Sequence, residues 1–319
     1  MAYIEWLRSH VGHRRVFLAF ASVILRDNQN RILLQKRTDF NFWGLPGGVL
    51  ELSESILNCA KRELREETGL IPGDFSLVGI YSDPKYEVTY PNGDQVQQYT
   101  VCLQAHLQGG QMQVDGNEAS DQRFFDPKDI PYNQIPLWYR DMLQAAIKGV
   151  LPSFEAPFTR TKTIPQIEVI RSLIGRAPYI GVGSVAILQD DRGWLLMVKR
   201  TDDGLWCLPG GFSNLGENAA YTAVRETMEE TGLHVTPTRL IGVFSPPDLW
   251  VYTNGDQTQA LITLFDCHVI GGNLQPDHIE TSAVAWMSPT EIIAQTTHPL
   301  MQSLHRAVIK HLDDGNFLR

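Results

Sequence analysis

The feature that most constrains this chain is a glycine-led acidic segment that occurs twice. The first copy, GGVLELSESILNCAKRELREETGL, spans residues 47–70, and the second, GGFSNLGENAAYTAVRETMEETGL, spans residues 210–233. In the first copy, Glu63, Glu66 and Glu67 are spaced so that a helix places all three on one face. Three carboxylates on one face repel one another, and a fold tolerates that crowding when a cation lies between them. Ligands that are all oxygen favour a hard ion, which predicts a Mg²⁺ or Mn²⁺ site.

The repeat extends over the whole chain. A shift of 163 positions superimposes Glu67 on Glu230, and it superimposes WGLPGG at residues 43–48 on WCLPGG at residues 206–211. A chain of 319 residues has the length of about two ordinary domains. A period this long is a whole domain rather than a solenoid unit, so we predict two copies of one domain.

A proline-containing segment, LPSFEAPFTRTKTIP, marks the joint between the copies. Its three prolines and its polar residues are typical of a linker. We predict the first domain over residues 1–150, the linker over 151–165 and the second domain over 166–319. Because this linker is short, we expect the two domains to pack on each other.

Both copies predict the same order of secondary structure. A short amphipathic helix is followed by two apolar strands, the glycine turn with its acidic helix, further strands around an Asn-Gly turn, and a closing amphipathic helix. Besides the acidic helices, we expect helices at 3–10, 136–148, 167–174 and 299–312, and strands at 16–25, 32–37, 77–82, 97–107, 123–125, 179–188, 195–200, 240–245, 260–269 and 285–287. Strands and helices mix without strict alternation. We therefore expect an α/β (α+β) fold, with an open mixed sheet between helices in each copy.

Composition argues against several classes of protein. A hydrophobic fraction of 43% suffices for two cores, and a formal net charge of −9 argues against nucleic acid or an anionic membrane as partner. No apolar run reaches the ~20 residues of a membrane span, and the start, MAYIEWLRSHVGHRR, lacks the apolar stretch of a signal peptide. The four cysteines form no CxxC pair, as is usual where thiols stay reduced. We expect a soluble, cytoplasmic protein.

The acidic segments resemble a known motif. In the first copy, Gly48 is followed after five residues by a glutamate and after seven more by RELREETGL, which resembles a complete Nudix box. The second copy repeats this spacing from Gly211 and departs from the usual pattern at Thr227, where an aliphatic residue is usual. A motif with many fixed positions that occurs twice is a specific signal. The resemblance implies two tandem Nudix-type α/β/α sandwiches and hydrolysis of a nucleoside diphosphate linked to another moiety.

The resemblance also implies roles for individual residues. The arginine at the start of each RE pair would hold the neighbouring glutamates by ion pairs, while Glu54 and Glu217 would stand behind the metal ligands. The implied catalytic residues are Arg62, Glu63, Glu118, Arg225, Glu226 and Glu280. The implied metal ligands are the carbonyls of Gly48 and Gly211 and the carboxylates of Glu63, Glu66, Glu67, Glu226, Glu229 and Glu230. Glu63 and Glu226 thus stand as either ligands or general bases. A plain surface-loop role stays open for Glu118 and Glu280.

Three further motifs leave two interpretations open. The Lys-Arg pairs at 36–37 and 199–200 end strands beside the sites, where they contact substrate phosphate or simply provide exposed charge. For Trp43 and Trp206, packing under the glycine loop is favoured over stacking on a base. The YPNGD and YTNGD turns need Asn-Gly for their geometry, and their Tyr and Asp leave a substrate-recognition role open.

These patterns predict a Mg²⁺-dependent pyrophosphohydrolase, with Mn²⁺ as the alternative ion and a small nucleotide as substrate. A phosphoanhydride repels anionic nucleophiles, so its hydrolysis calls for a cation that neutralises the phosphates. ADP-ribose-like compounds are the first substrate hypothesis, followed by dinucleoside polyphosphates and modified nucleoside triphosphates. As an alternative, one domain, and the second before the first, is a non-catalytic nucleotide-binding regulatory module. RNA 5′ ends are a further alternative, against which the acidic charge argues.

Overall fold

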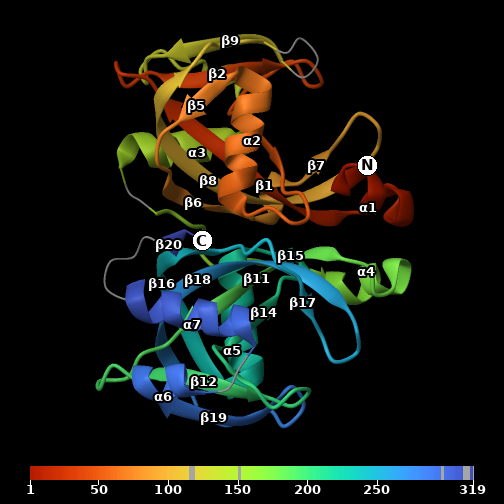
Figure 1. Ribbon diagram of the computed structural model, residues 1–319, viewed down its shortest axis with the longest axis vertical. Helices are drawn as coiled ribbons and strands as arrows, with labels where there is room; N and C mark the ends of the chain where they lie inside the picture. Colours follow the sequence, from red (N-terminus) through yellow and green to blue (C-terminus); the bar gives the residue numbers. More distant parts are fainter. Residues whose placement is uncertain (115–118, 150–151, 296–297, 312–316, 319) are drawn as a thin grey trace. The chain divides into compact units, whose positions relative to one another are not determined.

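The computed structural model describes residues 1–114, 119–149, 152–295, 298–311 and 317–318. The chain divides into two compact units, Met1–Ser153 and Phe154–Arg319. Each unit combines mixed β-sheet with helices on both faces, which confirms the predicted fold class (Figure 1). Within the described ranges, no helix is both long enough and apolar enough to cross a bilayer.

The first unit is built on two parallel central strands, β1 (Val16–Arg26) and β8 (Gln95–Gly110). β1 is buried at every position but one, because both faces of the sheet are covered there. The sheet extends through β2 (Ile32–Arg37), which pairs antiparallel with β1 and with β9 (Ala119–Phe125). The shorter strands are β3 (Trp43–Gly44), β4 (Gly47–Val49), β5 (Leu70–Pro72), β6 (Ser76–Tyr81) and β7 (Val88–Thr89).

Two helices cover opposite faces of this sheet. In Figure 1, α2 (Ile56–Thr68) lies in front of the strands and α3 (Leu137–Lys148) lies behind them. The side chain of Ser55 caps the start of α2 by accepting a hydrogen bond from a main-chain N–H, and the helix ends at Gly69 in the left-handed conformation. The remaining helical elements are α1 (Tyr3–Val11), η1 (Pro84–Tyr86) and η2 (Tyr132–Gln134).

The second unit repeats this plan around the parallel strands β11 (Tyr179–Ile187) and β18 (Gln257–Gly272). α5 (Ala219–Thr231) carries the second acidic segment. β12 (Leu195–Arg200), β13 (Trp206–Cys207) and β19 (Thr281–Met287) form a separate three-stranded sheet. The other elements are α4 (Gln166–Ile174), α6 (Pro289–Ala294), α7 (Pro299–His311), β14 (Gly210–Phe212), β15 (Leu215–Glu217), β16 (Leu233–Phe244), β17 (Trp250–Val251) and β20 (Phe317–Leu318).

Part of the predicted linker is a strand of the second unit. β10 (Thr159–Ile164) pairs antiparallel with β15, and Asn218 anchors the residues before it. The Nδ2 of Asn218 donates to the carbonyl of Ala156 at 2.7 Å, and the N–H of Phe158 donates to Asn218 Oδ1 at 3.1 Å. Its composition resembles a linker because an edge strand needs no apolar pattern once a partner strand supplies the hydrogen bonds.

Candidate active site

A double-glycine turn brings the main chain against the acidic face of α2. The N–H of Gly47 donates to Glu67 Oε2 at 2.8 Å, and Gly47 adopts a φ of 143°, which only glycine tolerates well. Gly48 lies directly under Glu63, because a Cβ on Gly48 would stand 2.4 Å from Glu63 Cδ. These contacts explain why two glycines precede the acidic helix at a fixed distance.

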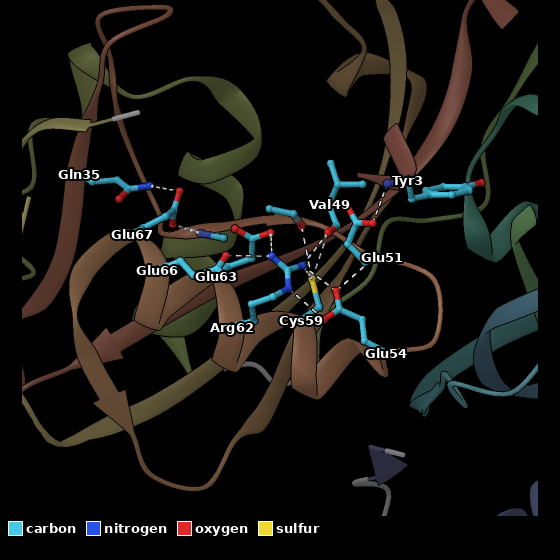
Figure 2. Close-up of polar contacts among 12 residues, drawn as sticks. Tyr3, Gln35, Val49, Glu51, Glu54, Cys59, Arg62, Glu63, Glu66 and Glu67 are labelled. Atoms are coloured by element: carbon cyan, nitrogen blue, oxygen red, sulfur yellow. Dashed lines mark hydrogen bonds and ion pairs between the residues drawn. The ribbon is translucent and has the colours of Figure 1, made fainter. Parts of the chain in front are cut away.

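Arg62 ties three glutamates of the first unit together (Figure 2). Its Nη2 donates to Glu54 Oε1 at 2.7 Å. Its Nη1 donates to Glu63 Oε1 at 2.6 Å and to Glu66 Oε2 at 3.2 Å. Charge-assisted bonds of this length restrict where each carboxylate can lie. Arg62 therefore orients Glu63 and Glu66, and Glu54 braces the arginine from behind.

The second unit reproduces this network around Arg225. The Nε of Arg225 donates to Glu217 Oε1 at 2.7 Å. Its Nη1 lies 2.7 Å from Glu226 Oε1 and donates to Glu229 Oε2 at 2.9 Å. Glu217 is 1% exposed, so this bracing carboxylate is even more enclosed than Glu54. Both units thus build the same arrangement from the same residue types.

The glycine turn of the second unit makes the same contacts. The N–H of Gly210 donates to Glu230 Oε2 at 2.8 Å, and a Cβ on Gly211 would stand 2.5 Å from Glu226 Cδ. Thr227, the one departure from the motif, is fully buried, and its hydroxyl donates to the main-chain carbonyl four residues earlier at 2.7 Å. The hydroxyl therefore has its hydrogen bond inside the core.

The carboxylates at each turn suit a hard divalent cation. Their donor atoms are all oxygen, as Mg²⁺ and Mn²⁺ prefer, and the glycines let the carboxylates of Glu63 and Glu226 approach the main chain closely. Among the described residues, no three His, Cys, Asp or Glu side chains already surround one point as metal ligands. Each guanidinium instead pairs with three carboxylates, those of Glu54, Glu63 and Glu66 for Arg62 and those of Glu217, Glu226 and Glu229 for Arg225.

Burial raises the pKa of two carboxyl groups in the second unit, those of Glu226 and Glu230. Desolvation raises the pKa of Glu226 to about 7, and Glu229 and Glu280 reinforce the shift while Arg225 opposes it. Desolvation, together with the charges of Glu226 and Glu280, raises the pKa of Glu230 well above its usual value. Carboxyl groups that share a buried site in this way are stabilised as anions by a positive charge between them.

A pocket of about 670 Å³ adjoins the acidic face of the second unit. This volume lies in the range of small-molecule sites, roughly 300–1,000 Å³. The lining combines the carboxylates of α5 with two aromatic rings, Trp250 and Tyr252, whose centroids are 6.0 Å apart. Apolar side chains of α7 complete it, namely Leu300, Met301 and Leu304. The pocket thus offers an acidic surface and an aromatic surface to one molecule.

The pocket gathers several residues that the sequence singled out. Glu280 and Arg200 line it, and so do Tyr252, Asn254 and Asp256 of the Asn-Gly turn. The Asn-Gly turn of the second unit therefore lines the pocket. Glu118, the counterpart of Glu280 in the first unit, lies outside the described residues.

The tryptophans of the two WxLPGG segments pack against apolar side chains of their own units. Trp43 is buried, and its ring lies edge-on to Phe125 at 5.0 Å. Trp206 packs against the apolar core of the second unit. Both positions agree with packing rather than with stacking on a base.

Three residues beside the sites are not predicted by the sequence patterns. Gln35 and Gln122 are buried next to Glu67, and Trp250 lines the pocket of the second unit. The sequence could have indicated Gln35, because this glutamine interrupts the apolar run of the strand ILLQKR. Trp250 begins the two-residue strand β17, which is too short to show the alternation of side chains that would predict its direction.

The profile of the NUDIX domain matches residues 17–146 and 178–312. The chain therefore belongs to the Nudix family and carries two Nudix domains. Here the two compact units are called domain 1 and domain 2.

Individual relatives match one domain at a time. The chain is 36% identical over 108 residues to the ADP-ribose pyrophosphatase of Methanocaldococcus jannaschii, a match that covers 33% of this chain and 60% of that protein. It is 25% identical over 167 residues to the RNA pyrophosphohydrolase of Psychrobacter cryohalolentis, covering 47% of this chain and 92% of that protein. The chain spans 60% to 66% of the length of the curated relatives to which it is 36% identical.

Among solved structures, the NUDIX domain of Shewanella oneidensis NrtR complexed with ADP ribose is 20% identical to the chain. The alignment covers 47% of this chain and 99% of that one, with a TM-score of 0.35.

Proposed function

We propose that both domains are metal-dependent pyrophosphohydrolases that cleave a phosphoanhydride in a nucleoside diphosphate linked to another moiety. The observation that carries this proposal is the arginine–glutamate network on the glycine turn, built once around Arg62 and again around Arg225. A domain that only bound nucleotides would not need Glu226, Glu229 and Glu230 held together at a cost in repulsion.

The ion that suits these sites is Mg²⁺, with Mn²⁺ as the alternative. Glu63, Glu66 and Glu67 would hold it in domain 1, with their counterparts Glu226, Glu229 and Glu230 in domain 2 and with the carbonyls of Gly48 and Gly211. When bound, such an ion neutralises the phosphates and makes a water molecule more acidic.

The chain's own groups then orient the reactants. Water adds to one phosphorus, the bridging P–O bond breaks, and a nucleoside monophosphate leaves together with a second phosphate-bearing product. Glu63 and Glu226 are the candidate bases for the proton that the water loses. The paired arginine holds each of them in place, and Glu280 is a further carboxylate beside the site in domain 2.

For the substrate we propose an ADP-ribose-like sugar nucleotide first, and a dinucleoside polyphosphate or a modified nucleoside triphosphate next. The name of the M. jannaschii relative supports the first choice. In domain 2, Trp250 and Tyr252 offer aromatic surface for a base, and Arg200 offers a positive charge for phosphate. RNA 5′ ends, suggested by the name of the P. cryohalolentis relative, fit the net charge of −9 less well.

Two single variants test the proposal on a panel of nucleotides. Glu67→Gln should abolish turnover in domain 1 and Glu230→Gln in domain 2, each by roughly a hundredfold or more. The double variant should be inactive on every substrate, and Arg123→Gln, a change on the exposed edge of domain 1, serves as a control. Wild-type turnover by Glu230→Gln across the panel would show instead that domain 2 is a non-catalytic regulatory module.

A further inference from the structure

Two buried glutamines distinguish the site of domain 1 from that of domain 2. Gln35 and Gln122 are cross-strand partners on β2 and β9, and they are 1% and 4% exposed. Both amides donate to the same residue: Gln35 Nε2 to Glu67 Oε1 at 2.9 Å, and Gln122 Nε2 to the main-chain carbonyl of Glu67 at 2.7 Å. Figure 2 shows Gln35 pointing from its strand toward Glu67. We call this pair the amide bracket.

The amide bracket leaves two buried oxygen atoms without a hydrogen bond among the described residues. They are the Oε1 atoms of the two glutamines. Leaving a buried acceptor unpaired is unfavourable. In domain 2 the equivalent cross-strand partners are Val198 and Val284, which bury no polar atom. Since valines serve the same sheet position, the bracket contributes something other than packing, and that contribution is its contact with Glu67.

Glu67 and Glu230 are consequently held differently. Glu67 accepts a hydrogen bond on each oxygen, from Gln35 and from the N–H of Gly47. Among the described residues, Glu230 accepts one hydrogen bond, on Oε2 from its glycine turn, and Val198, the counterpart of Gln35, carries no donor group. A carboxylate that accepts a hydrogen bond on each oxygen is more restricted in rotation about its terminal bond than one that accepts on a single oxygen.

We propose that Gln35, supported by Gln122, is a positioning residue that sets the Glu67 carboxylate for its divalent cation, so that domain 1 binds the ion more tightly than domain 2. A carboxylate that is already oriented loses less freedom when the ion binds. Groups that orient metal ligands in this way typically change metal affinity 10–100-fold. This inference rests on the proposed function, because it takes Glu67 and Glu230 as ligands.

Binding of Mn²⁺ to the full-length chain tests the proposal without any turnover. Electron paramagnetic resonance of free Mn²⁺ gives the number of bound ions and their affinities, and Glu230→Gln restricts binding to domain 1. In that background, Gln35→Met keeps the side-chain length but removes the donor, and we expect it to weaken Mn²⁺ binding about tenfold or more. The Mn²⁺ concentration for half-maximal activity should rise by the same factor, while kcat at saturating Mn²⁺ stays within about twofold.

Two further variants complete the experiment. Gln98→Met is the matched control, because Gln98 is also buried but donates to the main-chain carbonyl of Tyr86 at 2.8 Å. It should leave Mn²⁺ affinity unchanged. Val198→Gln, made in the Glu67→Gln chain, should tighten Mn²⁺ binding by domain 2 several-fold, and it tests the proposal even if Gln35→Met does not fold.

If Gln35→Met folds and its Mn²⁺ affinity is unchanged, the inference is wrong. If Gln35→Met does not fold, an unchanged Mn²⁺ affinity in Val198→Gln overturns the inference instead. Equal affinity of the two wild-type sites also overturns it, while the proposed function stands. A wild-type chain that binds no Mn²⁺ overturns both.

Discussion

Replacing Gly211 by alanine should disable domain 2 while leaving it folded. Gly211 has a negative or extended φ, so alanine can adopt its backbone conformation. The added Cβ, however, would lie 2.5 Å from both Cδ and Oε1 of Glu226, and ordinary contacts begin at 3.4 Å. The carboxylate must therefore retreat by about 0.9 Å (3.4 − 2.5). It cannot retreat freely, because Arg225 holds it at 2.7 Å.

The size of the effect follows from this displacement. A misplacement of about 1 Å in a reacting group typically lowers the rate about a hundredfold, which is about 2.7 kcal/mol of transition-state stabilisation. Overpacking a site costs about 1–3 kcal/mol of folding free energy. The low end applies here, because the clashing atoms belong to the end of a side chain rather than to the backbone. Activity should therefore fall far more than stability.

The assay uses the full chain with Glu67→Gln, so that turnover reports on domain 2. We would compare kcat/KM and the thermal midpoint of Gly211→Ala with those of Gly271→Ala. The nearest atom to a Cβ on Gly271 is 3.9 Å away, which makes it a control for the glycine-to-alanine change alone. If Gly211→Ala keeps a kcat/KM within twofold of the control, the assignment of Glu226 to the reaction is wrong.

Three further predictions address the pocket, the metal and the pH dependence. Trp250→Ala should raise KM for nucleotides by roughly tenfold with little change in kcat, because a base–aromatic stack contributes about 1–3 kcal/mol, and Trp250→Phe should retain most of the affinity. Removing divalent cations with a chelator should abolish hydrolysis, and added Mg²⁺ should restore it; turnover without any divalent ion would refute the metal dependence. Burial lowers the pKa of His305 to about 4 from 6.5, so the stability of domain 2 should be full above pH 6.5 and fall as the pH drops toward 4. The loss should approach about 3 kcal/mol, and thermal melts of His305→Leu should show a flatter dependence in this window.

Much of the fold is predictable because its signals are local. The acidic helix follows from spacings of three and four residues, and its boundaries follow from a serine cap and a glycine end. The order of elements in both domains matches the expectation, and the repeat itself supplies an internal check. Local pattern missed α6, β10 and the short strands β3, β4, β5, β7, β13, β14, β15, β17 and β20. For β10 the reason is that a strand's pairing depends on a partner far along the chain.

The candidate site is likewise predictable from the sequence only in part. The identity of the clustered glutamates is visible from the sequence, as is the arginine beside them. Their actual partners are not: Arg62 also reaches Glu54 eight residues back, and the glycine turn bonds to Glu67 twenty residues on. Such contacts are set by how β4 lies against α2, which no spacing rule predicts.

The sequence by itself determined that this chain holds two Nudix domains, each with one cluster of carboxylates on a helix face. Motif spacing and the internal repeat suffice for that, because both can be recognised from the order of residues along the chain without knowing which distant residues come into contact. Only the tertiary structure decided how the two sites differ. Cross-strand register pairs Gln35 with Gln122, whose amides both donate to Glu67, and it pairs Val198 with Val284 at the equivalent position of domain 2. The pairing of β17 with β18 places Trp250 in the pocket. These neighbours are far apart in the chain, so only the packing of sheet, helix and loop brings them together.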